Sequence, residues 1–159
     1  MINVKDNLLS KEKILEIYKI CRWSKYQRVE IDGENFPFTG LTCVLDLKHD
    51  IVKTITEAAE LPLKNLVRAY INLFLPNEQG FVHTDNANKD CTTLLYYVNT
   101  EPTGADDLGE TFFYLNNKIE GISPVPGRII TFDSRILHRA SSLRDVDRFT
   151  IALKWVPDK

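Results

Sequence analysis

The sequence predicts an α+β fold that is mainly β, an antiparallel sandwich or jelly roll with N-terminal helices packed on one sheet. Before Pro62, apolar residues recur twice at helical spacing. After Pro62 the spacing changes to alternation, in about eight short runs rich in β-branched and aromatic residues. Because turn residues and no helical run separate these segments, neighbouring strands are expected to pair antiparallel.

Two N-terminal helices are expected to cover one sheet. Ser10 is placed to cap a helix that runs to about Arg22 and carries an apolar stripe of Ile14, Ile17, Tyr18 and Cys21. A second helix is expected over about 51–60, with Pro62 marking its end. His49 stands beside the start of this helix and is interpreted as a capping or surface residue, not a metal ligand.

The chain of 159 residues is long enough for one domain, with helical support over about 10–62 and a β core over about 66–156. Val29 and Ile31 are candidates for a short edge strand. The remaining strands are expected at 66–75, 79–84, 92–99, 110–115, 118–122, 128–132, 137–140 and 149–156.

Composition excludes several classes of function. The net charge is -2, so there is no basic field for nucleic acid and no polybasic segment for a membrane surface. No apolar run approaches the ~18 residues of a membrane span. The three cysteines lie apart with no CxxC pair, which argues against a disulfide framework or a cysteine zinc site and favours a reducing cytoplasm.

A candidate metal site begins at His83-Thr84-Asp85. On an extended chain, residues His83 and Asp85 leave the same face. An H-x-D tripeptide alone is a weak signal, but His138 follows on a separate predicted strand. Two histidines and one carboxylate are typical of the facial triad of non-heme Fe(II) oxygenases. Asp85 also favours hydroxylation, because it occupies the coordination position that iron halogenases free for halide.

Arg148 is the first candidate for binding a cosubstrate. A guanidinium holds a carboxylate through two parallel hydrogen bonds, as a keto-diacid needs if its other end chelates iron. Thr150 shares the strand face of Arg148, and alternation turns Tyr97 toward the same interior. The alternative for Arg148 is a surface ion pair with Asp145 or Asp147.

Six segments, in this order and spacing, resemble a known family: 83–86, 93–99, 109–113, 124–133, 138–140 and 148–152. From about Val67 to Trp155 the chain resembles the Fe(II)/2-oxoglutarate-dependent dioxygenases, particularly the prolyl 4-hydroxylase-like branch. The arginine at 148, where collagen-type enzymes use lysine, makes the match closer to the hypoxia-type enzymes. Tyr70 and Asn72 share a face of the preceding strand, and either could reach the pocket.

The resemblance implies a double-stranded β-helix of cupin type, with iron held by His83, Asp85 and His138. It implies that the far carboxylate of 2-oxoglutarate meets Arg148 and Tyr97, with Thr150 and Tyr70 as further contacts. Dioxygen would convert 2-oxoglutarate to succinate and CO2 while a substrate is hydroxylated, and ascorbate is a candidate additional cofactor.

The implied substrate is a prolyl residue or another amino-acid side chain in a protein, peptide or amino acid. Substrate loops are expected at 23–42, 86–90 and 102–108. Asp106 and Asp107 in the last loop would favour a basic substrate, although loop carboxylates are usually just solvated.

Three alternatives stay open from the sequence. The enzyme could oxidise a small molecule, or it could demethylate a nucleic acid, which the net charge of -2 opposes. A non-catalytic cupin-like protein could bind a ligand or divalent metal without turnover. Turnover of 2-oxoglutarate without primary substrate would separate the last alternative from the enzymes.

Overall fold

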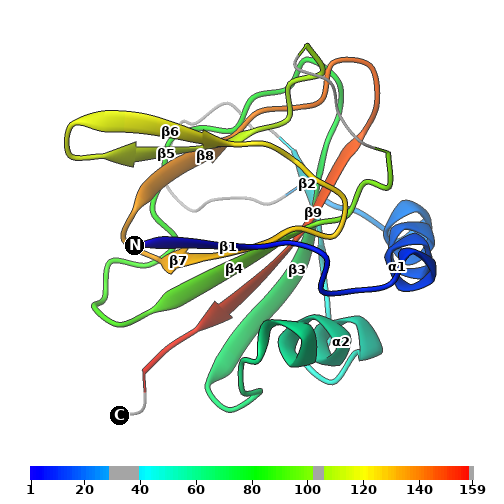
Figure 1. The fold of residues 1–159 in the computed structure, drawn as a ribbon, viewed down its shortest axis with the longest axis horizontal. Coiled ribbons are helices and arrows are strands. Elements are labelled where there is room, and N and C mark those ends of the chain that lie inside the picture. Colours follow the sequence, from blue (N-terminus) through cyan, green and yellow to red (C-terminus); the bar gives the residue numbers. More distant parts are fainter. Residues whose placement is uncertain (29–39, 102–105, 158–159) are drawn as a thin grey trace.

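Two antiparallel sheets form the body of the protein in a computed structural model that describes residues 1–28, 40–101 and 106–157. A six-stranded sheet has the order β1-β7-β4-β9-β3-β2, and a three-stranded sheet the order β6-β5-β8 (Figure 1). The elements are β1 Ile2–Lys5, α1 Lys11–Trp23, β2 Leu41–Val44, α2 Asp50–Ala59, β3 Leu66–Phe74, β4 Thr92–Tyr97, β5 Thr111–Leu115, β6 Lys118–Ile122, β7 Ile129–Asp133, β8 Leu137–Ala140 and β9 Arg148–Trp155. The predicted mainly β fold with N-terminal helices is confirmed. The assignment of 1–159 to a single domain stays a prediction.

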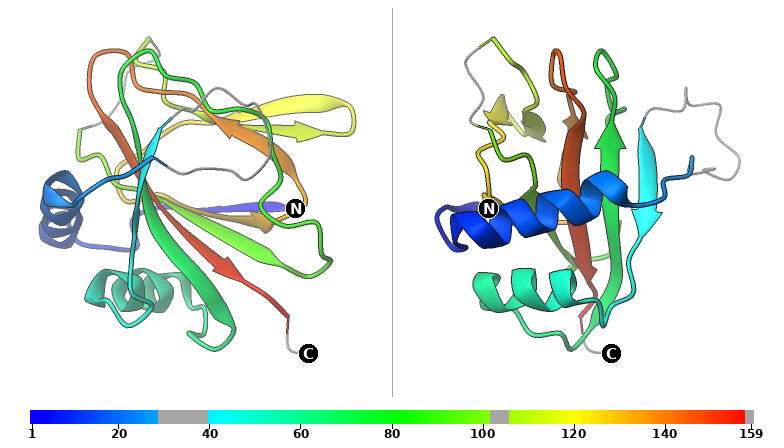
Figure 2. Two further views of the ribbon diagram at one scale, coloured as in Figure 1. Left: turned by 180° about the vertical axis from the view of Figure 1, so that it is seen from behind. Right: turned by 90° about the vertical axis from the view of Figure 1, so that its right-hand side faces the viewer.

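Both helices lie across the outer face of the large sheet (Figure 2). Ser10 caps α1 as predicted, since its Oγ accepts a hydrogen bond from the backbone N–H of Lys13 at 3.3 Å. His49 caps α2, with Nδ1 accepting from the N–H of Ile51 at 3.2 Å. The capping interpretation of His49 is therefore confirmed. Neither helix in the described ranges is long and apolar enough to cross a membrane.

Alternation divides the large sheet between two apolar clusters. Leu94, Tyr96 and Val98 join the outer cluster under the helices, whereas Leu95 and Tyr97 join the inner cluster between the sheets. Strand β9 divides in the same way, with its outer residues packed under the helices and its inner residues directed between the sheets. The inner face of the large sheet is therefore the surface on which a buried site can be built.

The predicted strand over 79–84 is wrong. This segment makes only isolated bridges, Gln79 with Ser141 and His83 with His138. At Gly80 the backbones approach so closely that a Cβ would lie 3.1 Å from the nitrogen of Ala140, so the position has no room for a side chain. The chain then turns, and the N–H of Asp85 reaches the carbonyl oxygen of Ser134 at 2.9 Å. This geometry interrupts the ladder of backbone hydrogen bonds that a continuous strand would make.

Two strands were not predicted from the sequence. Strands β1 and β2 are edge strands of four residues each, and both lie before Pro62, where no strand with these bounds was expected. The predicted edge strand at Val29 and Ile31 lies outside the described residues, as do parts of the expected loops 23–42 and 102–108.

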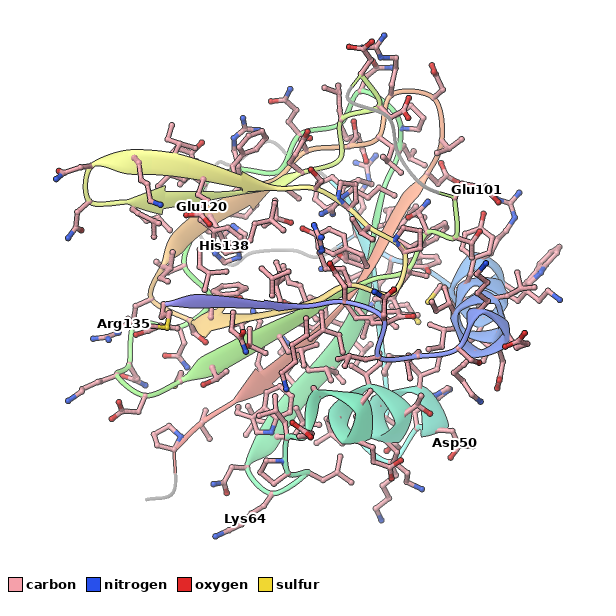
Figure 3. The ribbon with its side chains drawn as sticks, viewed as in Figure 1. Asp50, Lys64, Glu101, Glu120, Arg135 and His138 are labelled. Carbon is pink, nitrogen blue, oxygen red and sulfur yellow. The ribbon has the colours of Figure 1, made fainter. Side chains whose placement is uncertain are left out.

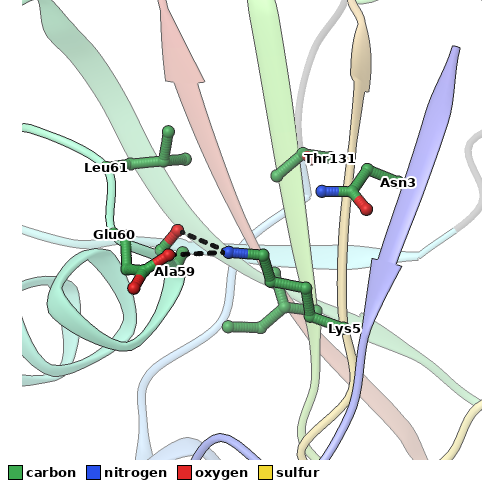
Figure 4. Close-up of a pocket in the computed structure, with 7 residues that line it drawn as sticks. Asn3, Lys5, Ala59, Glu60, Leu61 and Thr131 are labelled. Atoms are coloured by element: carbon green, nitrogen blue, oxygen red, sulfur yellow. Dashed lines mark hydrogen bonds and ion pairs between the residues drawn. The ribbon is translucent and has the colours of Figure 1, made fainter.

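A cavity of about 240 Å³ lies where β1 and β7 meet the end of α2 (Figure 4). Lys5 spans it and pairs with Glu60 at 3.2 Å. Its β7 residues, Ile129 and Thr131, alternate with the inner-face residues Ile130 and Phe132. The cavity therefore opens on the outer side of the sheet, and no predicted site residue lines it.

Replacing Tyr96 with Phe is expected to raise the free energy of unfolding by about 1 kcal/mol. The Tyr96 hydroxyl is buried and has no hydrogen-bond partner among the described residues, so its removal relieves a desolvation cost. Tyr97→Phe, one residue along β4, is the matched control. It should be destabilising, because the Tyr97 hydroxyl lies 2.7 Å from Thr111 Oγ1 and 3.2 Å from the Ile122 carbonyl oxygen. Urea denaturation measures the free energy of unfolding of both variants. Equal losses of this free energy in Tyr96→Phe and Tyr97→Phe would contradict the prediction.

Candidate active site

His83 and His138 face each other across an antiparallel bridge. The N–H of His83 donates to the carbonyl oxygen of His138 at 3.0 Å, and the reverse bond measures 2.9 Å. Directly opposed residues of such a pair project their side chains from the same face. The two imidazole rings accordingly lie 4.5 Å apart between centroids, and Figure 3 shows His138 in the space between the two sheets.

Hydrogen bonds set the orientation of both rings. Nδ1 of His83 lies 3.0 Å from the carbonyl oxygen of Phe81, and Nδ1 of His138 lies 2.9 Å from that of Ile136. A carbonyl oxygen only accepts, so the proton belongs on Nδ1 and the lone pair on Nε2. Both Nε2 atoms point toward Asp85, at 3.6 Å from Oδ1 for His83 and 3.7 Å from Oδ2 for His138. This tautomer leaves both Nε2 atoms free to bind a metal ion.

Asp85 is buried and held by two other side chains. Lys154 Nζ donates to Oδ1 at 2.6 Å, and Thr93 Oγ1 donates to Oδ2 at 2.7 Å. Ser134 Oγ lies 2.9 Å from Thr93 Oγ1 and extends the network. Burial by itself would raise the pKa of Asp85, but its polar neighbours, His83 and the charged Lys154 among them, outweigh burial and lower the pKa. The side chain is therefore a carboxylate near neutral pH.

His83, Asp85 and His138 are the one group of metal-binding residue types that converge in the described part of the chain, with ligand atoms all within 4.8 Å of one another. Phe113 stacks on the His138 ring at 5.8 Å and Phe132 packs edge-on at 4.9 Å. Burial in this apolar setting lowers the pKa of His138. A neutral imidazole, the form that binds metal, is thereby favoured.

Arg148 is buried, with 1% of its surface exposed. Its Nε donates to the carbonyl oxygen of Gly109 at 2.8 Å, and Nη2 donates to Thr111 Oγ1 at 3.0 Å. The guanidinium also lies 5.4 Å from the centroid of the Tyr97 ring. Burial lowers its pKa.

No described carboxylate forms an ion pair with Arg148. The alternative interpretation of this residue, a surface ion pair with Asp145 or Asp147, is therefore wrong. The guanidinium fork is instead buried, and the described carboxylate that acts on its charge, Glu110, does so without forming an ion pair.

The guanidinium and the metal-binding group lie at two positions along one strand. Thr111, which contacts Arg148, is two residues from Phe113, and Phe113 is the cross-strand partner of His138. At about 3.4 Å per residue these positions are roughly 7 Å apart. That spacing suits a short dicarboxylic acid with one end at each position.

The other predicted contacts lie in different places. Thr150 is buried on the same face as Arg148 and is paired in register with Tyr97. Tyr70 lies at the metal end instead, where its ring contacts Lys154 at 5.2 Å. The roles of these residues in binding 2-oxoglutarate stay predictions.

Sequence reasoning missed Lys154, Thr93 and Thr111. The signal for the first two was present, because alternation places Lys154 on the face of Arg148 and Thr150, and Thr93 on the face of Tyr97. Thr111 carried no comparable signal, since its contact with Arg148 depends on how the two sheets stack.

No protein-family model and no curated protein sequence matches the chain. Solved structures do match. A prolyl-4-hydroxylase from Pseudomonas putida has a TM-score of 0.79 at 15% identity, over 99% of this chain and 93% of that one. A Trichoplax adhaerens prolyl hydroxylase, in complex with a hypoxia-inducible-factor peptide, has a TM-score of 0.76 at 18% identity, over 97% and 82%.

The viral collagen prolyl hydroxylase of Paramecium bursaria Chlorella virus-1, in complex with 2-oxoglutarate, has a TM-score of 0.70 at 13% identity, over 99% and 96%. At these identities the likeness establishes the fold. The chain thus has the double-stranded β-helix fold of the prolyl 4-hydroxylases and other 2-oxoglutarate- and Fe(II)-dependent oxygenases.

Proposed function

We propose that the protein is a 2-oxoglutarate- and Fe(II)-dependent dioxygenase that hydroxylates a prolyl residue or another amino-acid side chain. The observation that carries the proposal is the buried guanidinium of Arg148, which has no ion pair with a described carboxylate and contacts Thr111, two residues along β5 from the cross-strand partner of His138 in a convergent group of two histidines and one carboxylate.

The buried charge of Arg148 supports an anionic ligand. Burying a cation without a partner is costly, and the cost is recovered when a carboxylate binds the guanidinium. Tyr97 and Thr111 extend the polar surface on which that carboxylate would rest. A ligand that also reaches the metal-binding group must carry a second ligating end, as 2-oxoglutarate does.

The donor set fits Fe(II). Nε2 of His83, Nε2 of His138 and the carboxylate of Asp85 would hold the ion, and two histidines with one carboxylate leave positions for cosubstrate and dioxygen. When bound, the iron would supply the oxidation, with 2-oxoglutarate consumed to succinate and CO2. The apolar residues around His138, including Phe113 and Phe132, would exclude water from the reaction.

Likeness to prolyl hydroxylases supports an amino-acid substrate. One of the similar structures contains a peptide and another contains 2-oxoglutarate. The net charge of -2 gives no support to a nucleic-acid substrate.

The test is succinate formation from 2-oxoglutarate under air, with Fe(II) and with ascorbate as a reductant. His138→Ala is expected to lower the rate at least about 100-fold, because removing a ligand costs more than the 10- to 100-fold loss typical of its supporting partners. His49→Ala is the matched control, since His49 caps α2 and lies outside the metal-binding group. Its rate should equal that of the wild type.

Two results would contradict the proposal. Equal rates in wild type and His138→Ala would show that the histidine takes no part. Absence of both succinate and metal-dependent 2-oxoglutarate binding would exclude an oxygenase, whereas binding without succinate, even with peptide and amino-acid substrates present, would favour the non-catalytic alternative.

A further inference from the structure

Two cationic side chains lie beside the metal-binding group and face each other across β3 and β9. Arg68 and Lys154 are direct cross-strand partners. The ring of Tyr70 lies against both, 5.3 Å from the guanidinium carbon of Arg68 and 5.2 Å from Nζ of Lys154. Both distances are within the range of cation–π attraction.

Alternation along β3 creates this arrangement, next to an irregularity in the strand. The pairing register with β9 shifts between Leu66 and Arg68, so that Val67 is an extra residue on β3. Beyond the shift the alternation is regular, and Arg68, two residues before Tyr70, shares its inner face and lies opposite Lys154. Bulges of this kind are over-represented next to active sites. Like charges placed directly opposite each other destabilise a sheet, so folding alone gives no reason for this pair.

The two cations differ in their partners. Lys154 is mostly buried and donates to Asp85 at 2.6 Å. Arg68 is exposed, and within the described residues its one recorded contact is the face of Tyr70. The charge of Arg68 is therefore open to a ligand that approaches the metal-binding group from this side.

Among the described residues, no carboxylate neutralises the charge of Arg68. Asp85 already pairs with Lys154 and, in the proposed function, is a ligand of the metal ion. One carboxylate of 2-oxoglutarate would bind the metal ion and the other would bind Arg148, so neither would pair with Arg68. The remaining ligand of such an enzyme is its primary substrate.

We propose that Arg68, supported by Lys154 and the ring of Tyr70, binds a carboxylate of the primary substrate. This inference rests on the proposed function and narrows its substrate class to acidic compounds. It runs against the basic substrate suggested by Asp106 and Asp107. The carboxylate could belong to an aspartate or glutamate near the target residue of a peptide, or to a free amino acid.

The experiment uses the full chain loaded with Mn(II) and 2-oxoglutarate in the absence of dioxygen. One pool contains acetylated and amidated peptides with a central proline and Glu, Gln or Lys at each neighbouring position. A second pool contains free amino acids and their amides. Ultrafiltration followed by mass spectrometry measures which members of each pool the protein retains.

In wild type, carboxylate-bearing members are expected to be retained roughly fivefold better than their amide counterparts, as a half-exposed ion pair supports. Arg68→Gln should abolish the preference, and Arg68→Glu should shift it toward Lys-containing peptides. Arg22→Gln is the matched control, because Arg22 is also exposed but lies on α1. Its preference should match that of the wild type.

Enrichment in the first pool assigns the carboxylate to a peptide, and enrichment in the second assigns it to a free amino acid. The proposal is overturned if the wild type shows no preference for carboxylate-bearing members. It is also overturned if Arg68→Gln keeps that preference. Thermal stabilisation by 2-oxoglutarate is recorded on the same samples. If 2-oxoglutarate stabilises a wild type that shows no preference for carboxylates, the Arg68 subsite is contradicted and the proposed function is not. If 2-oxoglutarate does not stabilise the protein either, both proposals are contradicted.

Discussion

Asp85→Ala is expected to lower the free energy of unfolding of the metal-free protein by about 3 kcal/mol and to abolish tight binding of divalent metal. The loss of stability arises because Lys154, whose side chain is 15% exposed, is left without the carboxylate that it contacts at 2.6 Å. The loss of metal binding arises because one of three converging ligands is removed. Urea denaturation in a chelating buffer and calorimetric titration with Mn(II) measure the two effects.

The double variant Asp85→Ala, Lys154→Met separates these effects. Removing the unpaired ammonium should restore most of the stability, because replacing both members of a buried ion pair by apolar groups is often close to neutral. Metal binding should stay absent. If the double variant were as unstable as Asp85→Ala, the cost would lie in the lost contacts with Thr93 and the histidines and not in the stranded charge of Lys154.

Arg148→Met is expected to weaken 2-oxoglutarate binding by about 3 kcal/mol, roughly 100-fold, while the ligand-free protein keeps or gains stability. The binding loss follows from removing the one buried cation placed for the far carboxylate. The stability follows because a buried guanidinium without a carboxylate partner is replaced by an apolar side chain of similar length. Thermal denaturation with Mn(II), with and without 2-oxoglutarate, measures both.

Arg128→Met is the control for this prediction. Arg128 already has a carboxylate partner, donating from Nε to Asp6 Oδ1 and from Nη2 to Oδ2, each at 2.8 Å. Its replacement should cost some stability, because it removes a tie to the segment after β1, and it should leave the 2-oxoglutarate response unchanged. A ligand response that survives in Arg148→Met would rule out the assigned role of Arg148.

Much of the fold was predictable because its signals are local. Helical spacing and the caps Ser10 and His49 indicated both helices, and alternation indicated seven of the nine strands within a few residues. Alternation also placed Tyr97 inside and Tyr96 outside, since the side chains of a strand have a period of two. The edge strands β1 and β2, which lie before Pro62 beside the two helices, were missed.

The site was predictable only in part, because the sequence carries local signals for its residues but not for the contacts between them. The sequence alone indicated His83, Asp85, His138 and Arg148, because their residue types and order are informative and each lies in a recognisable segment. Tertiary structure decided what those side chains meet. The contact between Lys154 and Asp85 joins residues 69 positions apart, and only the pairing of β3 with β9 sets Arg68 opposite Lys154. Such contacts depend on the pairing of distant strands, which the local periodicity of a chain does not encode.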